Sequence, residues 1–226
     1  MLGYFIFNNV SSADYLIINA LPTVYKPERD IKLIEVPGRD GFLTEDLGSY
    51  RGVTKSVECT IKDLSQIDYI CSWLTGSGDV VFSNEPTKKY KAVIINQIEF
   101  KRVFVNYRSF IILFECQPHK YGLSDDMLSL SVPGVVLSLS NTISMPKITV
   151  YGAGDIDLTI NSNIVHLTNV VTSVTIDSEL MDCYKGTTLK NSDMSGEFPV
   201  LISGVNNISW AGTVTEIEIL PHWRWL

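Results

Sequence analysis

Two closely spaced acidic residues come nearest to a catalytic pattern in this sequence. Asp177 and Glu179 lie two residues apart at the end of a predicted strand, so their side chains would point to one face about 7 Å apart. Paired carboxylates can hydrolyse glycosidic bonds. The alternative is an exposed acidic strand end, and it is favoured because no aromatic residues cluster around the pair in the sequence.

Other chemistry-bearing residues form no recognisable catalytic or metal-binding pattern. Asp155 and Asp157 share strand parity near glycines, which would suit calcium, but a turn with two solvated acids explains them better. The three histidines are far apart and no GxSxG elbow accompanies them. The four cysteines lack zinc-ligand spacing, so reduced core cysteines are expected. We therefore expect no enzyme activity, no metal and no cofactor.

Three tryptophans near the C-terminus are weak candidates for sugar binding, since aromatic faces stack on pyranose rings. Trp210 lies in a predicted strand, where a core role is favoured. Trp223 and Trp225 follow Pro221, where they could cover the end of a sandwich or meet a neighbouring molecule. Their positions leave both roles open.

The composition is that of a folded protein with an acidic surface. Of 226 residues, 45% are hydrophobic and 19% are charged, which is enough for a packed core. The net charge of −7 argues against non-specific binding to nucleic acid. No apolar run approaches the ~20 residues of a membrane helix, and the N-terminus lacks signal-peptide features, so we expect no membrane insertion.

One helix is predicted, over residues 65–76. Ile67, Ile70, Cys71 and Leu74 fall on one face, Ser65 is the predicted N-cap, and Gly76 is the predicted stop. An amphipathic helix of about three turns must lie on a sheet to bury its apolar face. Trp73 lies off that face, where it would extend past the sheet edge.

Strands are predicted on both sides of this helix. The strand at residues 30–36 ends in a dense turn signal at residues 37–41, and residues 42–52 look like a polar loop. Residues 110–116 are apolar on both faces, as expected of a central strand covered on both sides. The other strands of this half are predicted at residues 3–7, 15–20, 57–61, 80–82, 90–98 and 101–107.

The C-terminal half has shorter predicted strands at close spacing, typical of a sandwich or jelly roll. Residues 152–154 and 161–163 are predicted hairpin turns. We place the domain boundary near residue 125, giving domains 1–125 and 126–226, with a crossing strand within residues 126–142. The remaining strands are predicted at residues 147–151, 155–160, 164–167, 172–177, 208–210 and 213–220.

An ordered series of short motifs over nearly the whole chain resembles the distal tail proteins of long, non-contractile-tailed bacteriophages. Each motif alone is weak, and their order and spacing carry the resemblance. They are PGRDG at residues 37–41, WLTGSG at 73–78, FECQP at 114–118, PKITVYG at 146–152, IDSE at 176–179, GEFP at 196–199 and GVNNISW at 204–210.

The resemblance implies a mainly β protein, with an N-terminal β-sandwich carrying one helix and a C-terminal galectin-like or carbohydrate-module-like jelly roll. It implies a homohexameric ring at the tail tip, formed by the N-terminal domains. Its partners would be the tail tube or tail terminus, the tail-associated hub or fibre protein and, in some phages, the receptor-binding apparatus. The protein would be a virion component made in the bacterial cytoplasm, encoded by a phage or a prophage.

In such a ring, three residues are candidates for the subunit interface. Arg39 and Asp40 lie in the Pro-Gly turn, where Arg39 could make a bidentate contact to a neighbour's carboxylate. Trp73, beyond the sheet edge, is a favoured type of interface anchor. The alternatives are a solvated hairpin tip for the turn and, for the whole protein, a carbohydrate-binding module that attaches to host surfaces.

Overall fold

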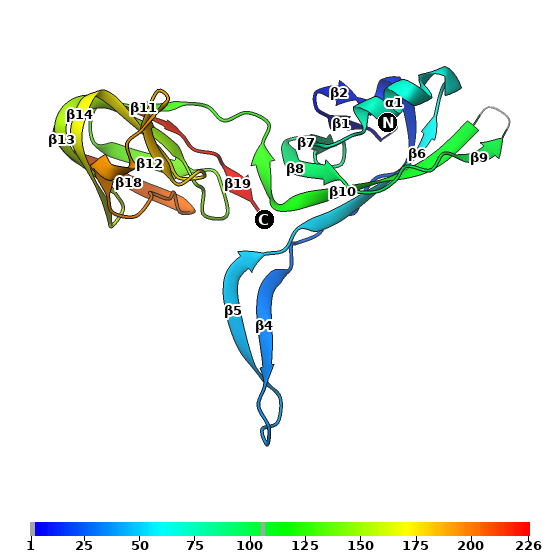
Figure 1. The fold of residues 1–226 in the computed structure, drawn as a ribbon, viewed down its shortest axis with the longest axis horizontal. Helices are drawn as coiled ribbons and strands as arrows, with labels where there is room; N and C mark the ends of the chain where they lie inside the picture. Colours follow the sequence, from blue (N-terminus) through cyan, green and yellow to red (C-terminus); the bar gives the residue numbers. More distant parts are fainter. Residues whose placement is uncertain (1–2, 105–106) are drawn as a thin grey trace. The chain divides into compact units, whose positions relative to one another are not determined.

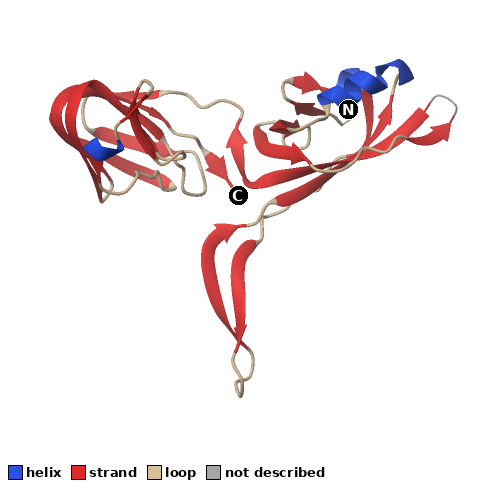
Figure 2. Ribbon diagram, viewed as in Figure 1, coloured by secondary structure: helices blue, strands red, loops and turns tan. Residues whose placement is uncertain are grey.

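The computed structural model describes residues 3–104 and 107–226, and these divide into two compact units (Figure 1). The first comprises residues 1–120 with Leu226, and the second comprises residues 121–225. Strands dominate both units, and α1 (Ile67–Trp73) is the one α-helix of the described residues (Figure 2). The predicted mainly β fold class is confirmed.

The main sheet of the first unit is antiparallel, with the order β2-β1-β7-β8-β10-β6-β3 and with β9 beside β10. Phe5 on β1 contacts Phe114 on β10 with ring centroids 5.5 Å apart, although two strands separate them in the sheet. The sheet therefore curls around its core. Its strands are β1 (Phe5–Phe7), β2 (Val10–Ser11), β3 (Leu16–Ala20), β6 (Val53–Ile61), β7 (Ser77–Phe82), β8 (Lys88–Ile94), β9 (Lys101–Phe104) and β10 (Tyr107–Gly122). A short 3-10 helix, Ser12–Asp14, precedes β3.

Strand β10 differs from its prediction. Phe110, Ile112 and Phe114 are buried, whereas Ile111 between them is 48% exposed. The strand is therefore buried on one face, because its other face is the open side of the sheet. The strand predicted at residues 101–107 includes residues 105 and 106, which lie outside the described part of the chain.

The predicted helix exists but is shorter than expected. A 3-10 turn, Leu64–Gln66, leads into α1, and the Asp63 side chain accepts a hydrogen bond from the Ser65 backbone N–H. Asp63 therefore caps the 3-10 turn, and the N-cap of α1 is Gln66 and not the predicted Ser65. The helix ends at Trp73 with Leu74 as its C-cap, and Gly76 (φ +80°) lies directly before β7 and does not cap the helix.

A separate two-stranded sheet, here called the ribbon, consists of β4 (Arg29–Glu35), β5 (Phe42–Tyr50) and the turn between them (Figure 1). The predicted turn at residues 37–41 is confirmed, with Gly38 and Gly41 at positive φ. The prediction of a loop over residues 42–52 is wrong, because β5 pairs with β4 from Phe42 to Tyr50. Both faces of β5 are exposed, so it lacks the alternation that marks a half-buried strand.

The second unit is a curled antiparallel sheet with the order β11-β18-β13-β14-β15-β16, with β12 beside β18 and β17 beside β14. Pairing of β11 and β12 with β18 shows that residues 128–130 and 134–138 are strands and not a loose linker. The elements are β11 (Leu128–Leu130), β12 (Gly134–Ser138), β13 (Lys147–Ile160), β14 (Asn163–Asp177), β15 (Asp182–Lys185), β16 (Thr188–Leu189), the 3-10 turn Asn191–Asp193, β17 (Met194–Ser195), β18 (Gly204–Leu220) and β19 (Arg224–Trp225).

Each of the long strands β13, β14 and β18 contains two short strands that were predicted separately. Residues 152–154 form no hairpin turn, because β13 runs through them with shifts of register. A Cβ on Gly152 would lie 2.3 Å from the Thr213 carbonyl oxygen, so this glycine permits close approach of β18. The turn at residues 161–163 is confirmed, with Asn161 at φ +57° between β13 and β14.

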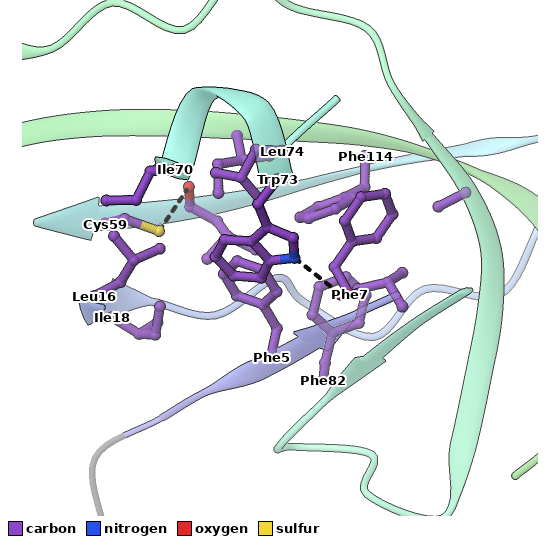
Figure 3. Close-up of a cluster of buried hydrophobic side chains, with 14 of the residues drawn as sticks. Phe5, Phe7, Leu16, Ile18, Cys59, Ile70, Trp73, Leu74, Phe82 and Phe114 are labelled. Carbon is purple, nitrogen blue, oxygen red and sulfur yellow. Dashed lines mark hydrogen bonds between the residues drawn. The ribbon is translucent and has the colours of Figure 1, made fainter. Parts of the chain in front are cut away.

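Each unit has its own apolar core. Four phenylalanines, Phe5, Phe7, Phe82 and Phe114, are fully buried in the first unit (Figure 3). All four cysteines are free thiols, as predicted, and three are buried. Cys71 is the exception, because it lies on the exposed face of α1, which corrects its predicted place on the apolar face.

Candidate functional site

The ribbon is exposed along nearly its whole length. Arg39 and Asp40 lie in its turn and are exposed, as the sequence predicts. Ion pairs join its strands and its base, with an Arg29 nitrogen 2.9 Å from Asp46 and an Arg51 nitrogen 2.9 Å from Asp30. The hydrogen bond from Arg29 holds the pKa of Asp46 below its ordinary value. These contacts order the ribbon but bury little of it.

One face of the ribbon carries an apolar stripe. Ile31, Leu33 and Phe42 lie on this face and are 40%, 52% and 55% exposed. A two-stranded ribbon is marginally stable in water by itself. Contiguous exposed apolar side chains are typical of surfaces that bind a partner. The stripe is therefore the strongest candidate for an interaction surface in the first unit.

The outer face of strands β3, β6 and β10 has two shallow grooves. One, about 330 Å³ in volume, is lined by polar and apolar residues that include Asn19, Glu58 and Ile111. The other, about 290 Å³, includes Ile17 and Val103. This mixture of apolar and hydrogen-bonding groups suits contact with protein.

Trp73 belongs to the core, so its predicted interface role is corrected. The residue is 9% exposed, and its ring stacks on Phe5 with centroids 5.6 Å apart and an interplanar angle of 8°. Its indole N–H donates a 3.0 Å hydrogen bond to the Phe7 carbonyl (Figure 3). Trp73 follows Ile70 by three residues, so both point to the sheet from one side of the short helix.

The acidic pair at the end of β14 has a structural role. Asp177 is 5% exposed, and its Oδ1 accepts hydrogen bonds from the backbone N–H groups of Glu179 and Leu180, at 3.2 and 3.1 Å. The strand ends at Asp177, so Glu179 does not share its face. Glu179 lies 3.6 Å from His222 Nδ1. The arrangement is a capped turn and not an acid–base pair.

Asp177→Ala should lower the free energy of unfolding of the second unit by about 1–3 kcal/mol, because two backbone N–H groups lose a charged acceptor in a buried turn. Urea denaturation monitored by tryptophan fluorescence, compared with Glu179→Ala, measures the difference. Equal stability of the two variants would contradict the capping role.

The other candidate residues of the second unit have separate partners. Asp155 Oδ1 accepts from the Asn169 backbone N–H at 3.1 Å, and Asp157 Oδ1 lies 2.6 Å from His166 Nδ1. Residues 3–104 and 107–226 contain no group of three or more His, Cys, Asp or Glu side chains that could hold a metal ion.

The three C-terminal tryptophans do not form a stacking platform. Trp223 is 6% exposed and belongs to the core of the second unit, which corrects its place among the sugar-binding candidates. Trp210, half-buried, packs against the same core. The Trp225 indole donates to the Leu139 carbonyl at 3.1 Å. Packing within the unit accounts for all three positions.

The sequence reading missed two features. The ribbon had a detectable signal, because Lys32 and Glu45 are placed symmetrically about the predicted turn, as hairpin pairing requires. The second feature is a pocket of about 190 Å³ between β14 and the segment that includes Lys190 and Asp193. The pocket lies beside two residues of β14 with positive φ values, Asn169 and Thr172. No residue pattern in the sequence predicts this irregular backbone.

No helix in the described part of the chain is long and apolar enough to cross a membrane.

Comparison with known proteins relates the chain to phage tail structures. No family model and no curated protein matches the sequence. The crystal structure of SPP1 Dit (gp 19.1), described as a paradigm of hub adsorption apparatus in Gram-positive infecting phages, matches with a TM-score of 0.78 and 13% identity over 100% of both chains. A chain of the phage p2 baseplate in its activated conformation matches with a TM-score of 0.52 and 7% identity, over 97% of this chain and 98% of that one. The chain therefore has, over its whole length, the fold of the SPP1 Dit protein, in agreement with the resemblance of its motifs to the phage distal tail proteins.

Proposed function

We propose that this protein is a distal tail protein, a structural hub at the tip of a long non-contractile phage tail. The observation that carries this proposal is the match of the entire chain, both units included, to a protein described as a hub of an adsorption apparatus. A match to a phage baseplate chain supports the same role. The hub would join the tail tube to the tail fibre and receptor-binding apparatus.

We propose that the ribbon makes the subunit contact of a homohexameric ring. The apolar stripe of Ile31, Leu33 and Phe42 is exposed and would be buried by contact with a partner. The outer face of β3, β6 and β10 on a neighbouring copy is a different, grooved surface that could make this contact. Contacts between two different surfaces of identical chains close into rings when the rotation permits. The number six comes from the resemblance to distal tail proteins.

The remaining roles follow from the same proposal. The protein would be a virion component made in the host cytoplasm, with tail proteins as partners and no chemistry of its own. The net charge of −7 favours protein partners over nucleic acid. The alternative, a carbohydrate-binding module that relies on the three tryptophans, has little support, because their rings are engaged in packing.

Negative-stain microscopy and mass photometry of the purified chain test the hub role. The expected result is a ring of six copies. A strict monomer at roughly 50 μM, with no ring in the presence of the tail-tube protein, would count against both the ring and the hub.

Arg39→Ala should raise the concentration needed for ring formation by about tenfold or more, because a charged contact at the ribbon tip is lost. The melting temperature of the monomer should not change, since Arg39 is exposed. Arg102→Ala, which removes an exposed arginine from β9, is the matched control. Unchanged assembly of the Arg39 variant would make the tip a simple solvated turn.

A further inference from the structure

The second unit has an apolar surface on β12 and the first residues of β18, two segments that pair with each other (Figure 1). Val136 on β12 and Asn206 on β18 lie opposite each other and are 5% and 0% exposed. Val135, Leu137 and Val205 alternate with them along the strands, so they point away from the core, and Leu137 lies opposite Val205. We call Val135, Leu137 and Val205 the β12 patch.

The β12 patch is open to solvent. Its three residues are between 54% and 64% exposed. Val132 and Leu139, which flank β12 in the chain, are 68% and 67% exposed. Single exposed aliphatic residues are ordinary, but a contiguous group of them marks an interaction surface. The β12 patch is therefore a candidate contact surface separate from the ribbon of the first unit.

Buried hydrogen bonds hold the backbone beneath the β12 patch. The Asn206 amide donates to the carbonyls of Ile202 and Gly204, at 3.0 and 3.2 Å, and its oxygen accepts from the Ile202 N–H at 2.8 Å. Asn206 thereby fixes the start of β18, next to Val205. A surface that is already ordered loses little conformational freedom when it binds.

The two chain segments that build this surface carry no charge. Residues 127–146 contain no Asp, Glu, Lys or Arg, and neither do residues 198–215, although 19% of the whole chain is charged. The first segment includes β12, and the second includes the part of β18 that pairs with it. The surface therefore offers no charge to an anionic or a cationic partner.

A second copy of this chain is the partner that an uncharged apolar surface fits. In a contact about a twofold axis, the same patch of both copies meets itself. A charged residue there would face its own sign and lose its hydration without a counter-charge. A different protein could supply the opposite charge, so it would not require neutrality over both segments. The net charge of −7 makes two copies repel each other, and an uncharged surface is where they can approach.

We propose that the β12 patch packs face to face against the β12 patch of a second copy, about a twofold axis. The contact removes Val135, Leu137 and Val205 of both copies from water, which favours association. It uses neither the ribbon nor the outer face of β3, β6 and β10, so it is independent of the contact proposed for the ring.

Cysteine crosslinking of the full-length chain tests the contact. Leu137→Cys is made in a Cys71→Ala background, because Cys71 is the exposed native thiol. A flexible bismaleimide, which tolerates an offset of the two thiols from the axis, should then give one covalent dimer on a denaturing gel. Val171→Cys is the matched control, since Val171 is 64% exposed like Leu137 but lies on β14, outside the patch. No dimer from Leu137→Cys, or equal dimer from both variants, would overturn the proposal.

Charge substitutions show whether the partner is a second copy. In sedimentation velocity, Leu137→Asp and Leu137→Lys should each weaken pairing by about tenfold or more, because like charges then meet in the contact. An equimolar mixture of the two variants should recover the pairing, since Asp faces Lys. Leu180→Asp, at an exposed apolar residue outside the patch, is the control for the added charge and should pair normally. No recovery in the mixture would overturn the proposal.

These measurements are made in a Leu33→Asp background, which removes the ribbon contact proposed for the ring. The expected species is then a dimer, and a strict monomer would overturn the twofold contact. A ring that forms with the ribbon intact, whatever the state of the β12 patch, keeps the hub proposal. Failure of one contact is therefore distinguishable from failure of the other.

Discussion

Trp73→Ala is expected to lower the free energy of unfolding of the first unit by about 3–5 kcal/mol. The substitution removes a buried ring that stacks on Phe5 and leaves a cavity against α1. It also leaves the Phe7 carbonyl without the indole donor that bonds it. Both effects lie inside the core, so the substitution should lower the stability of the first unit more than it weakens ring formation.

Hydrogen exchange at the amides of β1 and β7 measures this loss, because these strands lie next to the indole. Cys71→Ala, on the exposed face of the same helix, should change protection little. Trp73→Phe should give an intermediate result, since it keeps a ring for Phe5 but removes the N–H donor. Normal protection in Trp73→Ala together with failed ring formation would restore the interface role.

Glu85→Ala is expected to cost about 2–4 kcal/mol, because it breaks a largely buried ion pair. Glu85 Oε1 lies 2.6 Å from Lys120 Nζ, and the Glu85 and Lys120 side chains are 15% and 14% exposed. The Tyr90 hydroxyl donates to the other carboxylate oxygen. Lys55, which is 2% exposed and lies 4.7 Å from the Tyr90 ring centre, also loses a favourable charge.

The pH dependence gives this prediction a sign. Burial favours the neutral form of Glu85, but hydrogen bonds from Lys120 and Tyr90 outweigh it and hold the pKa below its ordinary value of 4.5. The stabilisation is therefore fully present above pH 4.5 and is lost as the pH falls through the lowered pKa of the folded state. Urea midpoints from pH 7 to about pH 3 should fall less steeply in Glu85→Gln than in the wild type. Parallel curves would mean that Glu85 contributes nothing to acid sensitivity.

The sequence predicted elements well where one face is buried and poorly where both faces have the same environment. Residues 57–61 alternate cleanly and lie within β6. Strand β5 has two exposed faces, so its period-two signal is missing and only the cross-strand charges mark it. The core position of Trp73 was not predicted, because the apolar face was assigned to Ile67, Ile70, Cys71 and Leu74. In the structure Ile70 and Trp73, three residues apart, point to the sheet, and Cys71 is exposed.

In the second unit, glycines were misread because their role depends on distant strands. Gly152 was predicted in a turn, and Gly212 falls in the gap between two predicted strands, yet each lies within a long strand where another backbone approaches closely. The pocket beside β14 could not be predicted from the sequence for the same reason. Its wall depends on Lys185 and Asp155, which bond β14 from two other segments.

Strand order in the first unit has a consequence for how the chain folds as it is synthesised. Strand β1 pairs with β7, and β6 lies between β3 and β10, so the sheet joins segments from both ends of the unit. Neither β1 nor β6 has all its partners until β7 and β10 have left the ribosome. Pairings over such long sequence separations form slowly and leave strand edges open meanwhile. The ribbon pairs only with itself, so its two strands have each other as partners as soon as β5 has left the ribosome, before β10 is made.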